Sequence, residues 1–121
     1  MAKRPVLRLR HMKDRIVAIK ALLSGKTFDE VAADGDARAA LERHLEVLSE
    51  ASRHLPDAWK AEHREIPWRN IADLGNVIRH AYDEVDLGIL WDVSEKRLPE
   101  LERTIDVLLN RNATDGDLSC L

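Results

Sequence analysis

The side chains best suited to chemistry in this chain lie close together near residue 80. Asn76 and His80 are four residues apart, so in a helix they project from one face and can meet. Histidine suits general acid or base catalysis because its unperturbed pKa of about 6.5 lies near neutral pH. Such pairs are also common on solvated helix faces, so the pair alone is weak evidence for acid–base chemistry.

The helix that must position this pair is expected at residues 67–82, with Pro67 in its first turn, where a missing N–H costs nothing. Helical periodicity gives this segment two opposite stripes. The buried stripe comprises Leu74, Ile78 and Ala81. The polar stripe comprises Arg69, Asp73, Asn76 and His80. The polar stripe predicts a dimer interface or the wall of a cleft, with a plain solvated face as the alternative. Tyr82 lies toward the buried side and joins His80 only if the helix ends or bends after residue 80.

Three other segments have long helical periodicity, and none alternates as a strand does. They are expected at residues 6–23, 36–54 and 86–109. Their apolar stripes comprise Leu9, Met12, Ile16, Ile19 and Leu23; Leu41, Leu45, Leu48, Ala51 and Leu55; and Leu101, Ile105, Leu108 and Leu109. Pro99 is expected to kink or split the last segment. The pattern predicts an all-α antiparallel bundle of four to five helices.

Shorter features complete the predicted domain. Thr27 with Glu30 matches a capping box for a short helix, and Gly35 is expected to break the pattern after it. The segment 57–64 is ambiguous and is a candidate for another short helix. Residues 1–110 are expected to form one helical domain, and the small, polar and acidic residues 111–121 a flexible tail.

Composition narrows the class of protein. The 121 residues are 45% hydrophobic and 34% charged, which predicts one globular domain, and no apolar run approaches the roughly 18 residues of a membrane span. One cysteine, Cys120, forms no internal disulfide or zinc cluster, which favours a cytoplasmic protein. The chain offers no metal site or cofactor motif. Three other histidines are interpreted as surface residues: His44, His54 and His63.

The charge is unevenly distributed along the chain. Residues 1–26 hold eight Lys or Arg and one Asp, a balance of +7, so the other 95 residues carry −10 against a total of −3. A basic first helix can contact phosphates. It can also pair with acidic helices of the same or a partner chain, and we favour pairing.

The segment 67–101 resembles the active-site region of the HepT-like ribonuclease toxins, a branch of the HEPN superfamily. The matching residues are Pro67, Trp68, Asn76, Ile78, His80, Tyr82, Val85, Asp86, Ile89, Trp91, Leu98, Pro99 and Leu101. Ser49-Glu50-Ala51 is similar to the family's Gly-Glu-Ala, and the whole resemblance covers about residues 5–110. Gly75 stands where the family pattern has an arginine. A glycine there suits a close helix–helix or helix–ligand approach, or a local bend.

The resemblance implies a homodimer that cleaves RNA, tRNA or another, without a metal. His80 would then act as general base or acid, and Asn76 would orient it or donate to a phosphate oxygen. Arg79 or Arg69 would supply the missing cation, and Asp73 would be a supporting residue. The implied partner is a minimal nucleotidyltransferase antitoxin of the MntA type, which attaches AMP to Tyr82 and so blocks RNA entry.

Two other functions stay open. Gly75 favours a dimeric module with a decayed nuclease site that only binds its nucleotidyltransferase. A structural bundle without any link to RNA is hard to reconcile with the matches in 67–101.

Overall fold

The computed structural model describes residues 4–80 and 86–112. Four helices form the bundle in these ranges: α1 (Pro5–Leu23), α3 (Gly35–Ser52), α5 (Trp68–His80) and α7 (Leu98–Asn112). Shorter elements join them: α2 (Phe28–Ala32), α4 (Asp57–Ala61), α6 (Leu87–Asp92) and the π-helix η1 (Val93–Arg97). The described ranges contain no strand, and the prediction of an all-α bundle is confirmed.

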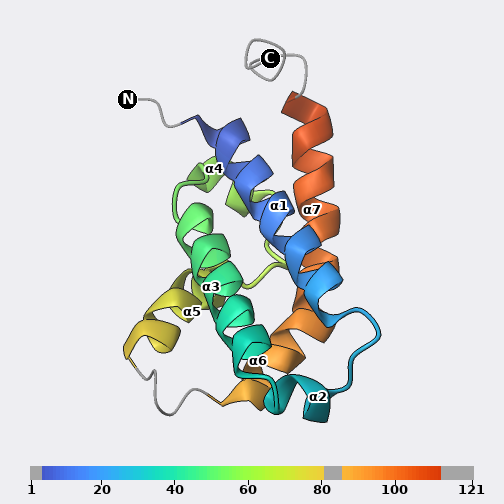
Figure 1. Cartoon of the computed structure of the whole chain (residues 1–121). Coiled ribbons are helices and arrows are strands. Elements are labelled where there is room, and N and C mark those ends of the chain that lie inside the picture. Colours follow the sequence, from blue (N-terminus) through green and yellow to red (C-terminus); the bar gives the residue numbers. More distant parts are fainter. Residues whose placement is uncertain (1–3, 81–85, 113–121) are drawn as a thin grey trace.

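Helix α1 lies between α3 and α7, and α5 packs on the side of α3 away from α7 (Figure 1). The contacts between neighbours run antiparallel. On α3 and α5, for example, Glu46 lies near Arg79 while Arg53 bonds to Ala72. The predicted stripes of the first two long helices are buried in full, and Leu101, Ile105 and Leu108 are buried on α7. Leu109 only packs against the core from its edge.

Local sequence explains the helix starts. Thr27 and Glu30 form the predicted capping box at the start of α2. Gly35 is the first residue of α3 rather than a break, because Asp34 caps the helix by accepting from the N–H groups of Asp36 and Ala37. The ambiguous segment 57–64 contains the short helix α4.

The segment that contains Pro99 is divided into α6 and α7, as expected, and the π-helix η1 joins them. The chain continues as a helix from α6 through η1 into α7, and the Leu98 N–H bonds back to the carbonyl of Val93. A proline lacks the N–H that an α-helical turn requires and its ring crowds the preceding turn, so widening that turn to π geometry removes the conflict. Helix α7 then continues to Asn112, two residues past the expected limit of the domain; residues 113–121 lie outside the described ranges.

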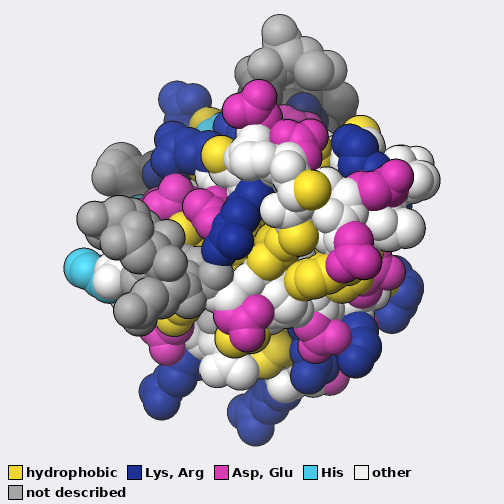
Figure 2. Space-filling model, turned by 60° about the horizontal axis from the view of Figure 1, so that its bottom comes forward, with side chains coloured by type: hydrophobic (Ala, Val, Ile, Leu, Met, Phe, Trp, Pro, Cys, Tyr) yellow, Lys and Arg dark blue, Asp and Glu magenta, His cyan; other side chains and the backbone are white. Residues whose placement is uncertain are grey.

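At one end of the bundle, hydrophobic side chains gather between acidic and basic ones (Figure 2). Phe28 of α2 and Ile89 of α6 are exposed there. The ring of Phe28 meets Trp91 edge to face, with centroids 5.7 Å apart. This contact links α2 to the end of α6. No helix in the described ranges is both long and apolar enough to cross a membrane.

One face of the basic helix α1 pairs with acidic α7, as we favoured from the sequence. Lys13 Nζ lies 2.9 Å from Glu102 Oε2 and 2.8 Å from Asp106 Oδ1, and Lys20 Nζ lies 3.1 Å from Glu102 Oε1. The hydrogen bond from Lys13 is the main cause that lowers the pKa of Glu102, against the opposing effect of burial. The other face of α1 contacts α3.

The Glu102 pairing makes stability depend on acid pH. A carboxyl whose pKa is lowered by folding stabilises the fold above its unfolded-state pKa, and this contribution is lost as pH falls through the folded-state value. Glu102→Gln should therefore lower the free energy of unfolding near neutral pH, with a difference from wild type that shrinks at acid pH. Urea unfolding at neutral and acid pH measures this difference; an equal difference at both would contradict the expectation.

Candidate active site on helix α5

Helix α5 buries one face and exposes the other. Ile71, Gly75 and Ile78 are buried against the rest of the bundle, while Leu74 is half-buried. The members of the predicted polar stripe are all exposed: Arg69, Asp73, Asn76 and His80. Val77, beside them, is 51% exposed. The division into two faces is confirmed for the described residues, and Ala81 lies outside them.

The middle of α5 is held on α3 by Ser49. Its hydroxyl donates to the carbonyl of Ala72 at 3.0 Å and accepts from the N–H of Gly75 at 3.0 Å. Arg53 Nη2 donates to the same carbonyl of Ala72 at 2.7 Å. A Cβ added to Gly75 would lie 3.0 Å from Ser49 Oγ. Glycine at position 75 therefore permits this close approach of two helices.

Arg79 folds back along α5 toward Gly75. Its Nη2 donates to Asn76 Oδ1 at 2.5 Å, and its Nη1 lies 3.9 Å from Glu46 Oε2 of α3. Its Nη1 is also 3.3 Å from the place where a Cβ of residue 75 would lie. The guanidinium of Arg79 thus occupies space beside Gly75 within the regular helix α5. Among the predicted site residues, Arg79 and Asn76 are therefore in direct contact.

The other predicted site residues are less constrained. His80 is exposed and is the last residue of α5. Arg69 and Asp73 are exposed earlier on the same stripe. Tyr82 lies outside the described residues, so its predicted modification is not tested.

Comparisons with known proteins identify the family. The model described as "Ribonuclease HepT-like" matches residues 12–108. A Thermococcus cleftensis protein named "Probable ribonuclease HepT" is 35% identical over 81 residues, which cover 67% of this chain and 74% of that protein. The chain belongs to the HepT-like ribonuclease family.

Two other relatives match more of the chain. "Putative RNase TTE0752" of Caldanaerobacter subterraneus subsp. tengcongensis is 28% identical, over 90% of this chain and 97% of that protein. "Gamma-glutamylcyclotransferase and putative RNase MJ0434" of Methanocaldococcus jannaschii is 30% identical, over 87% of this chain but 47% of that protein. No solved structure matches the chain significantly.

Gly75, which departs from the HepT-like pattern, and Ser49, in the segment similar to the family's Gly-Glu-Ala, are neighbours in space. Ser49 stands where the similar family segment has glycine, and Gly75 stands where the family pattern has arginine. The two residues touch through the Ser49 hydroxyl. The side chain that Ser49 adds on α3 therefore faces position 75 of α5, where the arginine side chain of the family pattern is missing. Sequence reasoning noticed each position but not their contact, which only the packing of α3 on α5 reveals.

A double-mutant cycle tests whether the Ser49 hydroxyl is the reason that position 75 requires glycine. Gly75→Ala alone should destabilise by about 1 kcal/mol, because an overpacked contact costs about 1–3 kcal/mol and exceeds the roughly 1 kcal/mol gained by removing a helical glycine. With Ser49→Ala, the same change should stabilise, because the hydroxyl is gone. Urea unfolding of the four proteins measures both effects. The same effect of Gly75→Ala in both backgrounds would contradict this role of the Ser49 hydroxyl.

Several other motif residues have structural roles here. Asp86 caps α6, since its Oδ1 accepts from the N–H of Gly88 at 2.8 Å. Trp68 Nε1 donates to the carbonyl of His63 at 3.0 Å and so anchors the start of α5. Leu98 and Leu101 are core residues of α7. These contacts fix the starts of α5 and α6 and the packing of α7 in the core.

The expectation of three surface histidines is right for one of them. His54 is exposed and lies 3.1 Å from Glu50. His44 is half-buried beside Arg15, and its pKa is lowered by burial and then by that charge. His63 is half-buried because the chain before α5 folds over α7.

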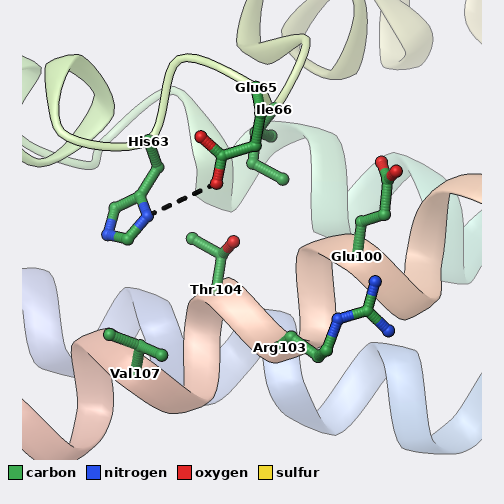
Figure 3. Close-up of a pocket in the computed structure, with 7 residues that line it drawn as sticks. All are labelled: His63, Glu65, Ile66, Glu100, Arg103, Thr104 and Val107. Carbon is green, nitrogen blue, oxygen red and sulfur yellow. Dashed lines mark ion pairs between the residues drawn. The ribbon is translucent and has the colours of Figure 1, made fainter.

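His63 lines a hollow of about 330 Å³ between that segment and α7. Figure 3 shows His63 and Glu65 above Thr104 of α7, with His63 Nδ1 3.7 Å from Glu65 Oε2. Within the described ranges, no group of three or more His, Cys, Asp or Glu is placed to hold a metal ion.

Proposed function

We propose that this HepT-like protein is the toxin of a toxin–antitoxin pair, a homodimeric ribonuclease that cleaves cytoplasmic RNA, tRNA or another, without a metal. The observation that carries the proposal is the free face of α5, where Asn76 and His80 are exposed and Arg79 bonds to Asn76. Family membership supports RNA as the substrate class.

The proposed chemistry is an attack within the RNA strand. The ribose 2′-oxygen forms a bond to the adjacent phosphorus as the bond to the 5′-oxygen breaks. A base removes the 2′-hydroxyl proton, an acid gives a proton to the 5′-oxygen, and the products carry a 2′,3′-cyclic phosphate and a 5′-hydroxyl. His80 suits either proton transfer because imidazole exchanges protons near neutral pH.

Asn76 and Arg79 would stabilise the charge of the reacting phosphate. The guanidinium of Arg79 is held by Asn76 and faces Glu46 at 3.9 Å, so it is partly ordered before RNA binds. A preorganised cation stabilises developing charge better than a mobile one. Arg79 would then replace the arginine that the family pattern has at position 75, while Arg69 is the alternative cation and Asp73 a supporting group.

The homodimer would pair the exposed faces of α5. A two-fold interface brings the same surface from both copies together, and half-exposed Val77 gives this face an apolar contact. The partner would be a minimal nucleotidyltransferase of the MntA type. Attachment of AMP to Tyr82, two residues after His80, would add bulk and negative charge beside the site and block RNA entry.

A second candidate function is a decayed site that only binds the nucleotidyltransferase. The observation in its favour is Gly75, where Ser49 Oγ occupies the space that a side chain would need. Induced expression without the partner distinguishes the two functions. Growth arrest and broken tRNA in wild type but not in His80→Ala would support the ribonuclease. Intact RNA and normal growth in both would favour the binding module.

A further inference from the structure

A groove extends from Arg79 along the face of α1 that does not pair with α7. Two adjoining hollows, of about 250 and 450 Å³, share His11, Arg43 and Val47 in their walls. The first hollow is also lined by Arg79, so the groove reaches the residue next to His80. Its walls come from α1, α3 and the end of α5.

Among the described residues, the permanent cations that line this groove are all arginines: Arg8 and Arg15 from α1, Arg43 from α3 and Arg79 from α5. The lysines on the opposite side of α1, Lys13 and Lys20, pair with α7. A guanidinium binds a phosphate with two parallel hydrogen bonds, which an ammonium does not do. Helix α1 therefore separates a lysine face that stabilises the fold from an arginine face that lines the groove.

The acidic groups of the groove do not neutralise all of the positive charge of these arginines. Three acids of the described ranges line it: Asp14, Glu46 and Glu50. Glu50 is already paired with His54 at 3.1 Å and lies 3.9 Å from Arg53, neither of which lines the groove. Glu46 is shared between Arg43 at 4.0 Å and Arg79 at 3.9 Å. The side chains of Arg8 and His11 make no hydrogen bond or ion pair with any residue of the described ranges, although the Arg8 backbone N–H bonds to Arg4.

We propose that this groove binds the sugar–phosphate backbone of the RNA strand next to the scissile bond, an assignment that rests on the proposed ribonuclease function. Arg8 and Arg43 bind phosphates of the same strand other than the reacting phosphate. Arg79 is the point where the bound strand passes to His80. The contacts are to phosphates, so they raise affinity for RNA of any sequence and position the strand without selecting bases.

The test measures binding of a fluorescently labelled single-stranded RNA by anisotropy, in the His80→Ala protein so that the RNA stays intact. Arg8→Gln with Arg43→Gln removes two groove cations and keeps much of each side chain. The matched control is Arg97→Gln with Arg103→Gln, which removes two exposed arginines outside the groove. Salt is varied between about 50 and 200 mM, because each lost phosphate contact lowers the salt slope by about 0.7 for a single strand.

We expect the groove variant to bind at least about tenfold more weakly at low salt, with a slope smaller by about 1.4, and the control to match its parent. Equal affinity and slope in the groove variant and its control, or no RNA binding by the parent, would overturn the assignment. RNA cleavage by the protein with His80 intact separates the two proposals. Cleavage that depends on His80 but not on Arg8 and Arg43 would contradict the groove assignment and leave the proposed ribonuclease function intact. RNA binding that depends on the groove, without any cleavage, would contradict the ribonuclease function.

Discussion

Replacing His80 by alanine is expected to lower the rate of RNA cleavage by about 10²–10⁴-fold, the usual contribution of a positioned acid or base. The loss should appear in single-turnover rates at saturating enzyme, because the variant removes a proton carrier rather than a binding contact. His80 is exposed at the end of α5, so the change should leave the thermal unfolding of the protein almost unaltered.

His54→Ala is the matched control for His80→Ala. His54 is also an exposed histidine, but it follows α3 and bonds to Glu50. The His54→Ala protein should therefore cleave RNA at the wild-type rate. An equal loss in both variants, or none in His80→Ala, would remove His80 from the proposed mechanism.

Arg79→Gln should lower the same rate by about 10²–10³-fold, the typical effect of removing one group that stabilises charge in a transition state. Glutamine keeps a donor near Asn76 but loses the positive charge that faces the phosphate. The single-turnover rate at saturating enzyme should fall more than the RNA affinity, since the contact strengthens as charge develops.

Arg69→Gln provides the comparison that decides between the two candidate cations. Arg69 is exposed on the same stripe of α5, eleven residues before His80. The Arg69→Gln protein should retain near-wild-type cleavage if Arg79 is the cation that stabilises the reacting phosphate. The reverse pattern, with Arg69→Gln inactive and Arg79→Gln active, would assign the role to Arg69.

Much of the fold follows from local patterns in the sequence. The apolar spacing in α1 and α3 predicted their buried faces, and Thr27 with Glu30 predicted the cap of α2. Other features depend on how remote parts of the chain fit together. Pro99 predicted the division of the last segment, but periodicity could not predict that a π-turn joins its two helices.

The candidate site was predictable to a similar extent. Periodicity placed Asn76 and His80 on one exposed stripe, and the structure agrees. The contact of Ser49 with Gly75 joins residues 26 apart in the chain, so it required the packing of α3 on α5. The position of the Arg79 guanidinium follows from that packing, because the space beside Gly75 is open to it. The homodimer, the antitoxin and the modification of Tyr82 stay predictions.

The measurement that tests the central claim most directly is the chemistry of the RNA ends made by the purified protein in the presence of EDTA. A 2′,3′-cyclic phosphate and a 5′-hydroxyl, formed by wild type and not by His80→Ala, are the predicted result. Cleavage that needs added metal, leaves a 3′-hydroxyl or persists in His80→Ala would contradict a metal-independent ribonuclease built on His80.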